Sequence, residues 1–215
     1  MITSLNFSAS PNLGDNLEPF VELKFPVKGK SLPADHGYGL YAAFVHLIPE
    51  IRQEKKLSLL TIPGLGDQDG KIFLTHQSCF KIRIPVSQVP LVYKLAGNQV
   101  SVGRHPIKIG IPQISFLEPA ERLKARIVTI KNSWEPDKFL ASVRGQLNNL
   151  GISGVPSVSI DKQGNISRKT IKIKQYQIIG FTTEISGLSE QDSLKLQQWG
   201  IGGKRHMGCG FFCAL

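Results

Sequence analysis

The alternation of hydrophobic and polar positions predicts one set of elements that occurs twice along the chain. In the first half, residues 19–27 alternate as a strand, and residues 36–53 place apolar side chains on one face of a helix: Leu40, Tyr41, Phe44, Val45 and Ile48. Asp35 is the predicted cap of that helix. Strands are predicted at residues 57–62, 71–84 and 99–109, with a turn at 64–70 and a short helix at 87–95. The order is βαββαβ.

The second half of the chain repeats this order. Residues 123–131 form a predicted strand, and a helix runs from Pro136, since the first helical turn tolerates proline, to about Leu150. Strands at 156–160 and 168–184 flank a turn at 161–165, and a helix at 189–199 takes Ser189 as its cap. A glycine-rich loop at 200–210 leads to a last strand within residues 209–215.

Two βαββαβ units predict an α+β fold made of tandem ferredoxin-like (RRM-like) domains. The N-terminal domain is assigned to residues 1–110 and the C-terminal domain to residues 121–215. Residues 111–120, which contain Pro112 and Pro119, are the predicted linker. Such sheets occur in many RNA-binding modules, but the fold alone does not define a function.

The net charge narrows the class of partner. The chain has 26 Lys and Arg residues against 16 Asp and Glu residues, which gives a formal charge of +10 and a pI of about 9.6. A polyanion is therefore the expected partner, with a generally basic protein as the alternative. Residues 162–174 contain five basic side chains and no acidic one, and this clustering favours nucleic acid.

The N-terminal residues and the cysteines bear on the compartment. The first ten residues lack a basic segment followed by an apolar run, so no signal peptide is predicted. No apolar stretch approaches the roughly 20 residues that span a bilayer, so no membrane partner is expected. Three cysteines are an odd number and too few for a disulfide framework, which fits the cytoplasm.

Residues 168–174 (RKTIKIK) form the first candidate RNA-binding segment. With a period of two, Ile171 and Ile173 face one way, while Thr170, Lys172 and Lys174 face the other. A row of cations on a strand suits phosphate contacts, and the alternative is an edge strand protected by lysines against pairing. The candidate RNA-binding residues here are Arg168, Lys169, Lys172 and Lys174.

The glycine-rich loop is the second candidate segment. Five glycines within residues 200–210 allow the backbone to approach another surface closely, and two adjacent cations suit phosphate. Neither a P-loop nor a GxGxxG pattern fits. The alternative is a flexible connector before the last strand. The candidate RNA-binding residues are Gly202, Gly203, Lys204, Arg205 and His206.

His36 is the candidate for proton transfer. It lies at the start of the first predicted helix, near the edge of the apolar stripe, and a histidine pKa of about 6.5 permits acid or base catalysis near neutrality. Taken alone, such a histidine is more often structural. His206, Cys209 and Cys213 are too few for a tetrahedral zinc site, so no metal or other cofactor is expected. No G-x-S-x-G elbow is present.

The chain resembles the CRISPR-associated repeat-RNA endoribonucleases of the Cas-six type, in the RAMP superfamily. The resemblance spans essentially the whole chain. It rests on the tandem ferredoxin-like layout, on residues 32–41 (LPADHGYGLY) and on the glycine-rich loop with its basic insert. Residues 32–41 are similar to those of one cyanobacterial or myxobacterial-type branch.

The resemblance implies metal-independent cleavage of precursor CRISPR RNA within each repeat. The ribose 2′-OH attacks the adjacent phosphate and leaves 2′,3′-cyclic phosphate and 5′-OH ends. By position, His36 matches the family's catalytic histidine, and Tyr38 or Tyr41 would orient the phosphate or ribose, although Tyr41 also fits the core. Candidates for a catalytic lysine, none of them in a matching motif, are Lys28, Lys30, Lys55 and Lys56.

The resemblance also implies the partners. The basic residues of the two candidate segments would hold the stem-loop of the CRISPR repeat by its phosphates, and the product would pass to other subunits of an interference complex. One alternative is a non-catalytic RNA-binding subunit of the same fold, in which His36 is structural. Another is a general tandem RNA-recognition protein, which is disfavoured because no aromatic pair fits its stacking motif.

Overall fold

The N-terminal half forms an antiparallel sheet built around one long strand. The computed structural model describes residues 18–161 and 163–215, apart from the side chains of residues 67 and 68. Strand β1 (Phe20–Gly29) pairs with β6 (Cys79–Pro85) on one side and with β8 (His105–Ile109) on the other. The sheet order is β3-β6-β1-β8-β7, where β3 is Ser58–Leu60 and β7 is Gln99–Val102. Helices α1 (Gly37–Leu47) and α2 (Val89–Tyr93) complete the βαββαβ unit.

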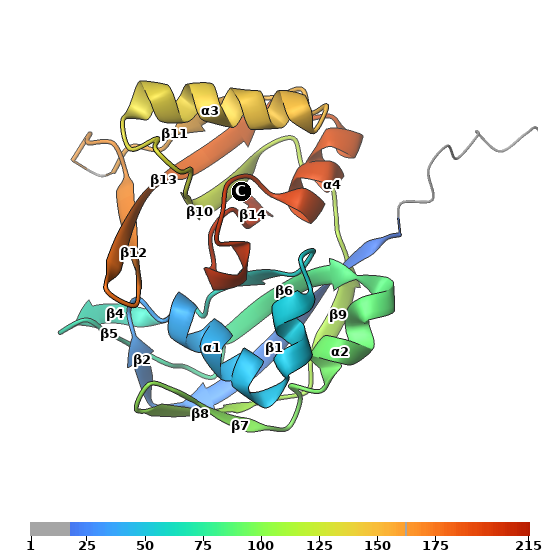
Figure 1. Cartoon of the computed structure of the whole chain (residues 1–215), viewed down its shortest axis with the longest axis vertical. Helices are drawn as coiled ribbons and strands as arrows, with labels where there is room; N and C mark the ends of the chain where they lie inside the picture. The colour runs from blue at the N-terminus through green and yellow to red at the C-terminus, as the bar shows by residue number, and fades with distance from the viewer. Residues whose placement is uncertain (1–17, 162) are drawn as a thin grey trace, which may run out of the picture.

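The C-terminal half has the same topology. Its strands are β10 (Leu123–Val128), β11 (Val155–Val158), β13 (Tyr176–Ser186) and β14 (Phe212–Ala214), in the order β11-β13-β10-β14. Helices α3 (Pro136–Asn149) and α4 (Glu190–Trp199) are the connections, and β12 (Arg168–Ile173) pairs with β13 (Figure 1). In both halves the fourth strand of the unit pairs with the first, and the first with the third. The predicted α+β fold of tandem ferredoxin-like domains is confirmed.

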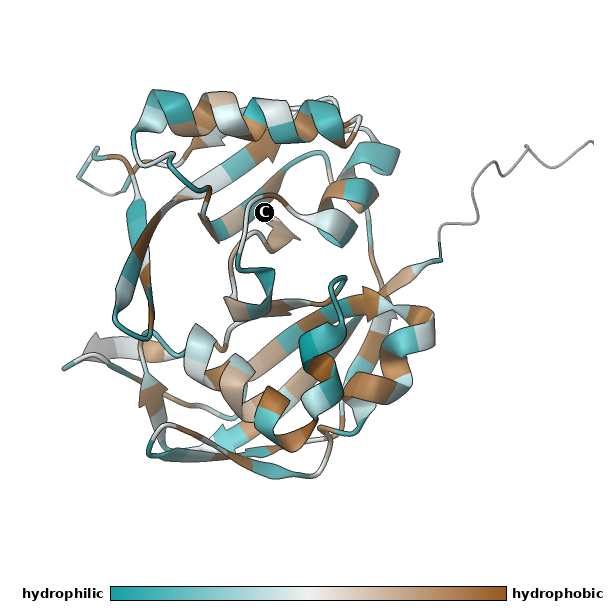
Figure 2. Cartoon of the chain, in the orientation of Figure 1, coloured by the Kyte–Doolittle hydropathy of each residue, from teal (hydrophilic) through white to brown (hydrophobic). Residues whose placement is uncertain are grey.

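Each half has its own hydrophobic core beneath its helices. In the first, alternate residues of β1 (Leu23, Phe25, Val27) meet Leu40 and Phe44 of α1. The second core gathers residues of α3, β10, β13, α4 and β14: Phe139, Val143, Ala125, Phe181, Leu196 and Phe212. Figure 2 accordingly shows hydrophobic residues along much of the strands and hydrophilic residues at the turn of the β12–β13 hairpin. The domain boundaries at residues 110 and 121 stay a prediction.

Several predicted elements are divided in the structure. The helix predicted over residues 36–53 ends at Leu47, because Pro49 cannot continue it, and residues Pro49–Gln53 form a 3-10 helix. The strand predicted at 71–84 is two strands, β5 (Lys71–Phe73) and β6. Strand β5 joins β2 (Ser31–Pro33) and β4 (Leu65–Gln68) in a small separate sheet, and β4 lies where a turn was predicted.

Two long predicted strands are hairpins. The segment 99–109 turns at Gly103, between β7 and β8, and the segment 168–184 turns after Ile173, between β12 and β13. Both strands of each hairpin alternate with the same period, and only a shift of phase marks the turn: Val100 and Val102 precede the first turn, and Ile107 and Ile109 follow it. The predicted linker contains strand β9 (Gln113–Phe116), which pairs with β1. Two smaller predictions are confirmed: α3 begins at Pro136, and the Ser189 hydroxyl accepts the backbone N–H of Asp192 (3.1 Å).

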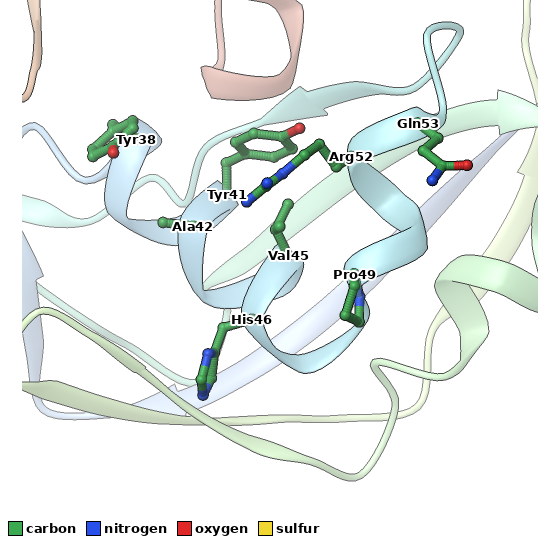
Figure 3. Close-up of a pocket in the computed structure, with 8 residues that line it drawn as sticks. All are labelled: Tyr38, Tyr41, Ala42, Val45, His46, Pro49, Arg52 and Gln53. Carbon is green, nitrogen blue, oxygen red and sulfur yellow. The ribbon is translucent and has the colours of Figure 1, made fainter.

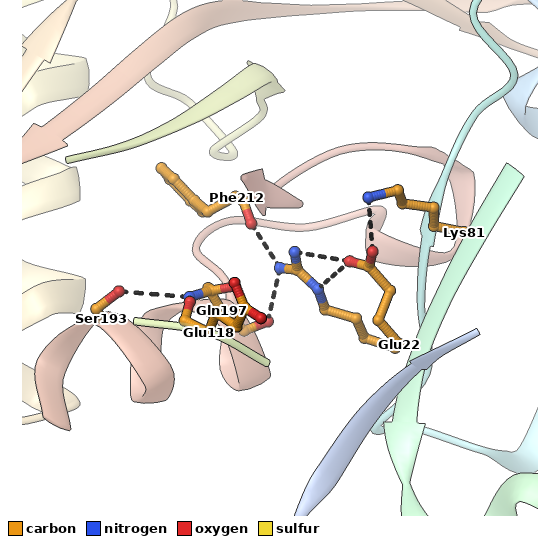
Figure 4. A network of polar contacts seen from close by, with 7 residues as sticks. Glu22, Lys81, Glu118, Ser193, Gln197 and Phe212 are labelled. Carbon is orange, nitrogen blue, oxygen red and sulfur yellow. Dashed lines mark hydrogen bonds and ion pairs between the residues drawn. The ribbon is translucent and has the colours of Figure 1, made fainter. Parts of the chain in front are cut away.

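A buried polar cluster joins the two halves. Arg83 of β6 is 2% exposed and pairs with Glu22 of β1 (2.9 Å), which also accepts Lys81. The Arg83 guanidinium donates to the backbone carbonyls of Gln197 (3.3 Å) and Phe212, in the C-terminal half. Figure 4 shows these partners around the guanidinium. A buried cation therefore contributes to the relative placement of the halves.

None of the helices in the described residues is long and apolar enough to cross a membrane.

Candidate functional site

Three segments that are distant in sequence meet between the two halves. They are the start of α1, the turn end of the β12–β13 hairpin, and the 3-10 helix η3 (Arg205–Met207) within the glycine-rich loop (Figure 1). The backbone N–H of Lys172 donates to the Asp35 carboxylate. At Gly37, a Cβ atom would lie 2.2 Å from the Met207 carbonyl oxygen, so glycine alone permits this approach. We call this region the junction site.

Asp35 differs from its predicted role as a helix cap. The N-cap residue of α1 is His36, and no side chain caps the helix. The Asp35 carboxylate instead accepts the N–H of Lys172 from the other half of the molecule. A hydrogen bond between the two halves of the molecule therefore replaces the predicted hydrogen bond at the start of the helix.

His36 lies at the junction site with its ring buried. The residue is 4% exposed. Its Nδ1–H donates to the Pro33 carbonyl (2.9 Å), and Nε2 accepts the backbone N–H of Ile62 (3.0 Å). These partners define one neutral tautomer, and burial lowers the pKa of His36 below its ordinary value. The two hydrogen bonds of the ring connect the start of α1 to the residues after β3. Nε2 can accept a proton only after its hydrogen bond from the Ile62 N–H breaks.

Tyr38 and Tyr41 line a surface cavity of about 620 Å³ along α1 and the 3-10 helix that follows it. Figure 3 shows Tyr41 beside Arg52, with Tyr38 further toward the start of the helix. Both tyrosines are half-buried. The Tyr41 ring packs partly against the N-terminal core and also faces the ring of His206, with centroids 5.2 Å apart. The packing supports the interpretation of Tyr41 as a core residue, and its role in the site stays a prediction.

His206 and Arg205 attach the glycine-rich loop to the N-terminal half. The His206 Nε2 atom lies 2.9 Å from the Glu54 carbonyl oxygen. The Arg205 guanidinium donates to the carbonyls of Lys55 (3.1 Å) and Trp199. Arg205 is half-buried, so much of its hydrogen-bonding capacity serves the protein itself.

The loop residues before η3 border a second cavity. The N–H of Gly202 donates to the Gln146 side chain (2.8 Å), and the N–H of Gly203 donates to the Thr129 carbonyl (2.9 Å). Gly202 has a φ of +81°, and a Cβ there would lie 2.5 Å from the same carbonyl oxygen. With the exposed Lys204, these residues line a cavity of about 600 Å³.

The basic residues of the hairpin are exposed. On β12, Ile171 is buried and Lys172 exposed, as the alternation predicts, and Lys169 is exposed as well. Arg168 donates to the Trp134 carbonyl (3.0 Å). Lys174 lies in the turn after the strand, with a φ of 55°. The hairpin therefore presents cations to solvent up to the point where it reaches Asp35.

Three cations near these cavities were missed from the sequence. Arg52 lines the cavity beside Tyr41, and Lys131 lines the cavity beside Lys204. Arg126 of β10 lies close enough to His36 for its charge to contribute to the lowered pKa. Only Arg126 had a signal, because it occupies a polar position in an alternating strand. The other two are brought to the cavities by tertiary folding.

The cysteines are free thiols in the described structure. Burial raises the pKa of Cys209 to about 11, so this thiol is protonated near neutrality. Over residues 18–161 and 163–215, no group of three or more His, Cys, Asp or Glu side chains is placed to hold a metal ion.

Fold and site together define a tandem ferredoxin-like protein with a basic, histidine-containing junction between its halves. The sequence profile of the family described as Cas6 Crispr matches residues 21–215. A CRISPR-associated endonuclease Cas6 from Myxococcus xanthus (strain DK1622) is 30% identical over 201 residues, which cover 94% of this chain and 84% of that protein. The chain therefore belongs to the Cas6 family of CRISPR-associated endoribonucleases, the enzymes of precursor CRISPR RNA processing.

Solved structures agree on the fold. A CRISPR-associated protein Cas6 superposes with a TM-score of 0.64 at 11% identity, over 92% of this chain and 99% of that chain. A RAMP protein described as binding different RNA substrates gives a TM-score of 0.61 at 12% identity, over the same shares of the two chains. The predicted family is confirmed, and the family favours the endonuclease over the non-catalytic alternative.

Proposed function

We propose that this chain cuts precursor CRISPR RNA inside each repeat by attack of a ribose 2′-OH on the adjacent phosphorus, without a metal cofactor. The O2′–P bond forms as the P–O5′ bond breaks, which leaves a 2′,3′-cyclic phosphate and a 5′-OH. This reaction needs a base for the 2′-OH, an acid for the leaving oxygen and cations beside the pentacoordinate phosphorus.

The observation that supports this proposal most is the convergence of two basic segments on the start of α1. The hairpin reaches Asp35 through Lys172, and the glycine-rich loop reaches Gly37 through Met207. A repeat stem held along the hairpin and by Lys204 would place its backbone over the junction site.

The RNA stem would be held mainly by shape and charge. An A-form stem has a major groove too narrow for side chains to read easily, so backbone contacts dominate. Exposed cations along β12 and beside the glycine-rich loop suit such contacts. The proposed contacts come from Arg168, Lys169, Lys172, Lys174, Gly202, Gly203, Lys204, Arg205 and His206. Protein groups already accept the single N–H donors of Gly202 and Gly203 and part of the donors of Arg205, which leaves these three residues less capacity for phosphate.

The catalytic roles of His36, Tyr38 and Tyr41 stay predictions. Tyr38 and Tyr41 border an open cavity, which suits contact with a ribose or phosphate. His36 would act as base or acid only after a local rearrangement, since both ring nitrogens bond to the protein backbone.

Incubation of the chain with RNA of its own CRISPR repeat, in excess EDTA, tests the proposed chemistry. Cleavage at one position should persist in EDTA. The upstream fragment should resist periodate until the cyclic phosphate is opened and the phosphate removed, and the downstream fragment should accept phosphate from a polynucleotide kinase. A repeat RNA with 2′-deoxyribose at the cut should bind but stay intact. Cleavage of that 2′-deoxy RNA would refute attack by the 2′-OH.

The fate of the product is a further part of the proposal. The many backbone contacts with the stem would hold the product after cleavage. The chain would then stay on its product, act in the cytoplasm and deliver the RNA to other subunits of an interference complex. Slow product release after one turnover, in a gel-shift assay, would support this.

A further inference from the structure

We propose that His206 is a catalytic residue of the RNA cleavage reaction, and that it acts as the base for the attacking 2′-OH. This inference rests on the proposed function and deepens it. It is carried by the hydrogen bonds of His206, by its contact with Tyr41 and by the cavity that Tyr41 shares with Arg52.

The hydrogen bond to Glu54 defines the protonation of the ring. A carbonyl oxygen can only accept, so the His206 Nε2 atom, 2.9 Å from the Glu54 oxygen, must carry the hydrogen. In the neutral ring, Nδ1 then has a lone pair. None of the described residues forms a hydrogen bond with this Nδ1, and the residue is half-buried rather than enclosed. In its neutral form, His206 thus has one ring nitrogen, Nδ1, without a hydrogen-bond partner among the described residues.

His36 differs in each of these respects. Its ring is buried, and both of its nitrogens are occupied by backbone groups of Pro33 and Ile62. Protonation of His36 at Nε2 breaks a buried hydrogen bond and leaves the Ile62 N–H without its partner. His206 accepts a proton at Nδ1 with no such loss. Of the two histidines at the junction site, His206 is the one already arranged for proton transfer.

The surroundings of His206 supply a place for the nucleotide. Tyr41 lines the 620 Å³ cavity, and its ring centroid lies 5.2 Å from that of His206, so His206 is a neighbour of the cavity through Tyr41. The cavity also holds Arg52, whose guanidinium lies beside the Tyr41 ring in Figure 3. Unpaired bases commonly stack on aromatic rings, and guanidinium groups commonly bind the phosphates of the backbone. Tyr41 is a positioning residue for His206, and Arg52 supplies a cation.

The proposed step balances without a co-reactant. The 2′-OH proton passes to Nδ1 of His206 as the O2′–P bond forms. The P–O5′ bond breaks, and the leaving oxygen takes a proton from water in the open cavity. His206 returns to the neutral form by releasing its proton to solvent. The Glu54 carbonyl keeps the Nε2–H throughout and favours the positive charge that develops on the ring.

Two substitutions at His206 separate chemistry from structure. His206→Gln can keep a donor for the Glu54 carbonyl but has no basic nitrogen, whereas His206→Ala loses both. The control is His76→Ala, because His76 is exposed in the loop between β5 and β6, outside the junction site. The probes are repeat RNA for single-turnover cleavage with saturating enzyme, and its 2′-deoxy analogue for affinity. Thermal unfolding of every variant checks that the fold is intact.

We expect both His206 variants to cleave about 10²–10⁴-fold more slowly at saturating enzyme, a larger loss than any loss of affinity for the 2′-deoxy RNA. Added imidazole should restore part of the cleavage rate of His206→Ala. It should leave the cleavage rate of the control, His76→Ala, unchanged. Wild-type cleavage by His206→Gln would overturn the inference, because the hydrogen bond would then be the only role of the ring. Weakened affinity with an unchanged rate at saturation would overturn it too.

The failure of the proposed function has a different signature. If the wild-type chain leaves the repeat RNA intact, or gives ends other than a cyclic phosphate and a 5′-OH, the proposed reaction itself is wrong. If the wild type cleaves as proposed while His206 variants cleave equally fast, only the assignment of His206 is wrong. In that case the rate of His36→Gln shows whether His36 carries the chemistry.

Discussion

Replacement of His36 by alanine should destabilise the protein independently of RNA. The ring is 4% exposed and makes two hydrogen bonds with backbone groups, one to Pro33 and one from Ile62. Alanine leaves both groups unpaired. A buried group that loses its partner costs about 1–3 kcal/mol, and the Pro33 carbonyl lies in a less buried residue than Ile62. With the cavity left by the ring, the expected loss is about 3 kcal/mol in the free energy of unfolding.

Urea unfolding followed by circular dichroism measures this loss. His36→Gln is the matched variant, since its side-chain oxygen can accept the Ile62 N–H, and it should lose less than His36→Ala. His76→Ala is the control at an exposed site. A change below about 0.5 kcal/mol for His36→Ala would refute the structural role, because that is the range of ordinary surface substitutions.

The pH dependence of stability supplies a second measurement. Burial lowers the pKa of His36 in the folded protein, so between the folded value and the unfolded value of about 6.5 the unfolded chain binds more protons. The contribution of the neutral ring is complete above pH 6.5 and declines as the pH falls toward the folded value. The advantage of the wild type over His36→Gln should therefore shrink from pH 7 to pH 5. An advantage that stays constant over this range would contradict the assigned protonation.

Three further variants test the RNA-binding surface, the glycine-rich loop and the contact between the halves. Lys172→Gln together with Lys174→Gln should weaken repeat RNA binding and make its salt dependence shallower by up to about two in the log–log slope. An unchanged slope in filter binding would exclude the hairpin. Gly202→Ala forces a Cβ to 2.5 Å from a backbone oxygen at a φ of +81°. We expect a loss of about 1–3 kcal/mol in urea unfolding, and an unchanged midpoint would show that the loop relaxes freely. Arg83→Met removes one of the two cations that pair with Glu22 and leaves two buried carbonyls without this donor, which should cost about 3–5 kcal/mol, measured as a lower Tm.

Local sequence patterns were reliable wherever a local force decides the structure. Ser189 caps α4 because its hydroxyl reaches a backbone N–H three residues on, and Pro136 starts α3 because the first turn needs no donor there. The same kind of reasoning failed for Asp35, since a carboxylate at a helix start has a competing partner in Lys172, which is 137 residues away. Long alternating runs failed at Gly103 and after Ile173, because alternation has the same period on both sides of a tight turn.

The sequence indicated the segments of the junction site one by one, but it did not indicate that they lie together. Charge and glycine content marked the hairpin and the loop, and the family resemblance marked His36. The distances between them depend on how two independently cored halves pack, through buried contacts such as those of Arg83, and no local pattern encodes that packing. The same holds for the histidines, whose chemistry depends on which nitrogen meets a backbone group. The amino-acid sequence by itself therefore determined the repeated βαββαβ fold, the basic surface and the family. Only the tertiary structure decided that His36 is enclosed by backbone partners while His206 keeps a nitrogen free, because hydrogen bonding and burial arise from segments far apart in the chain.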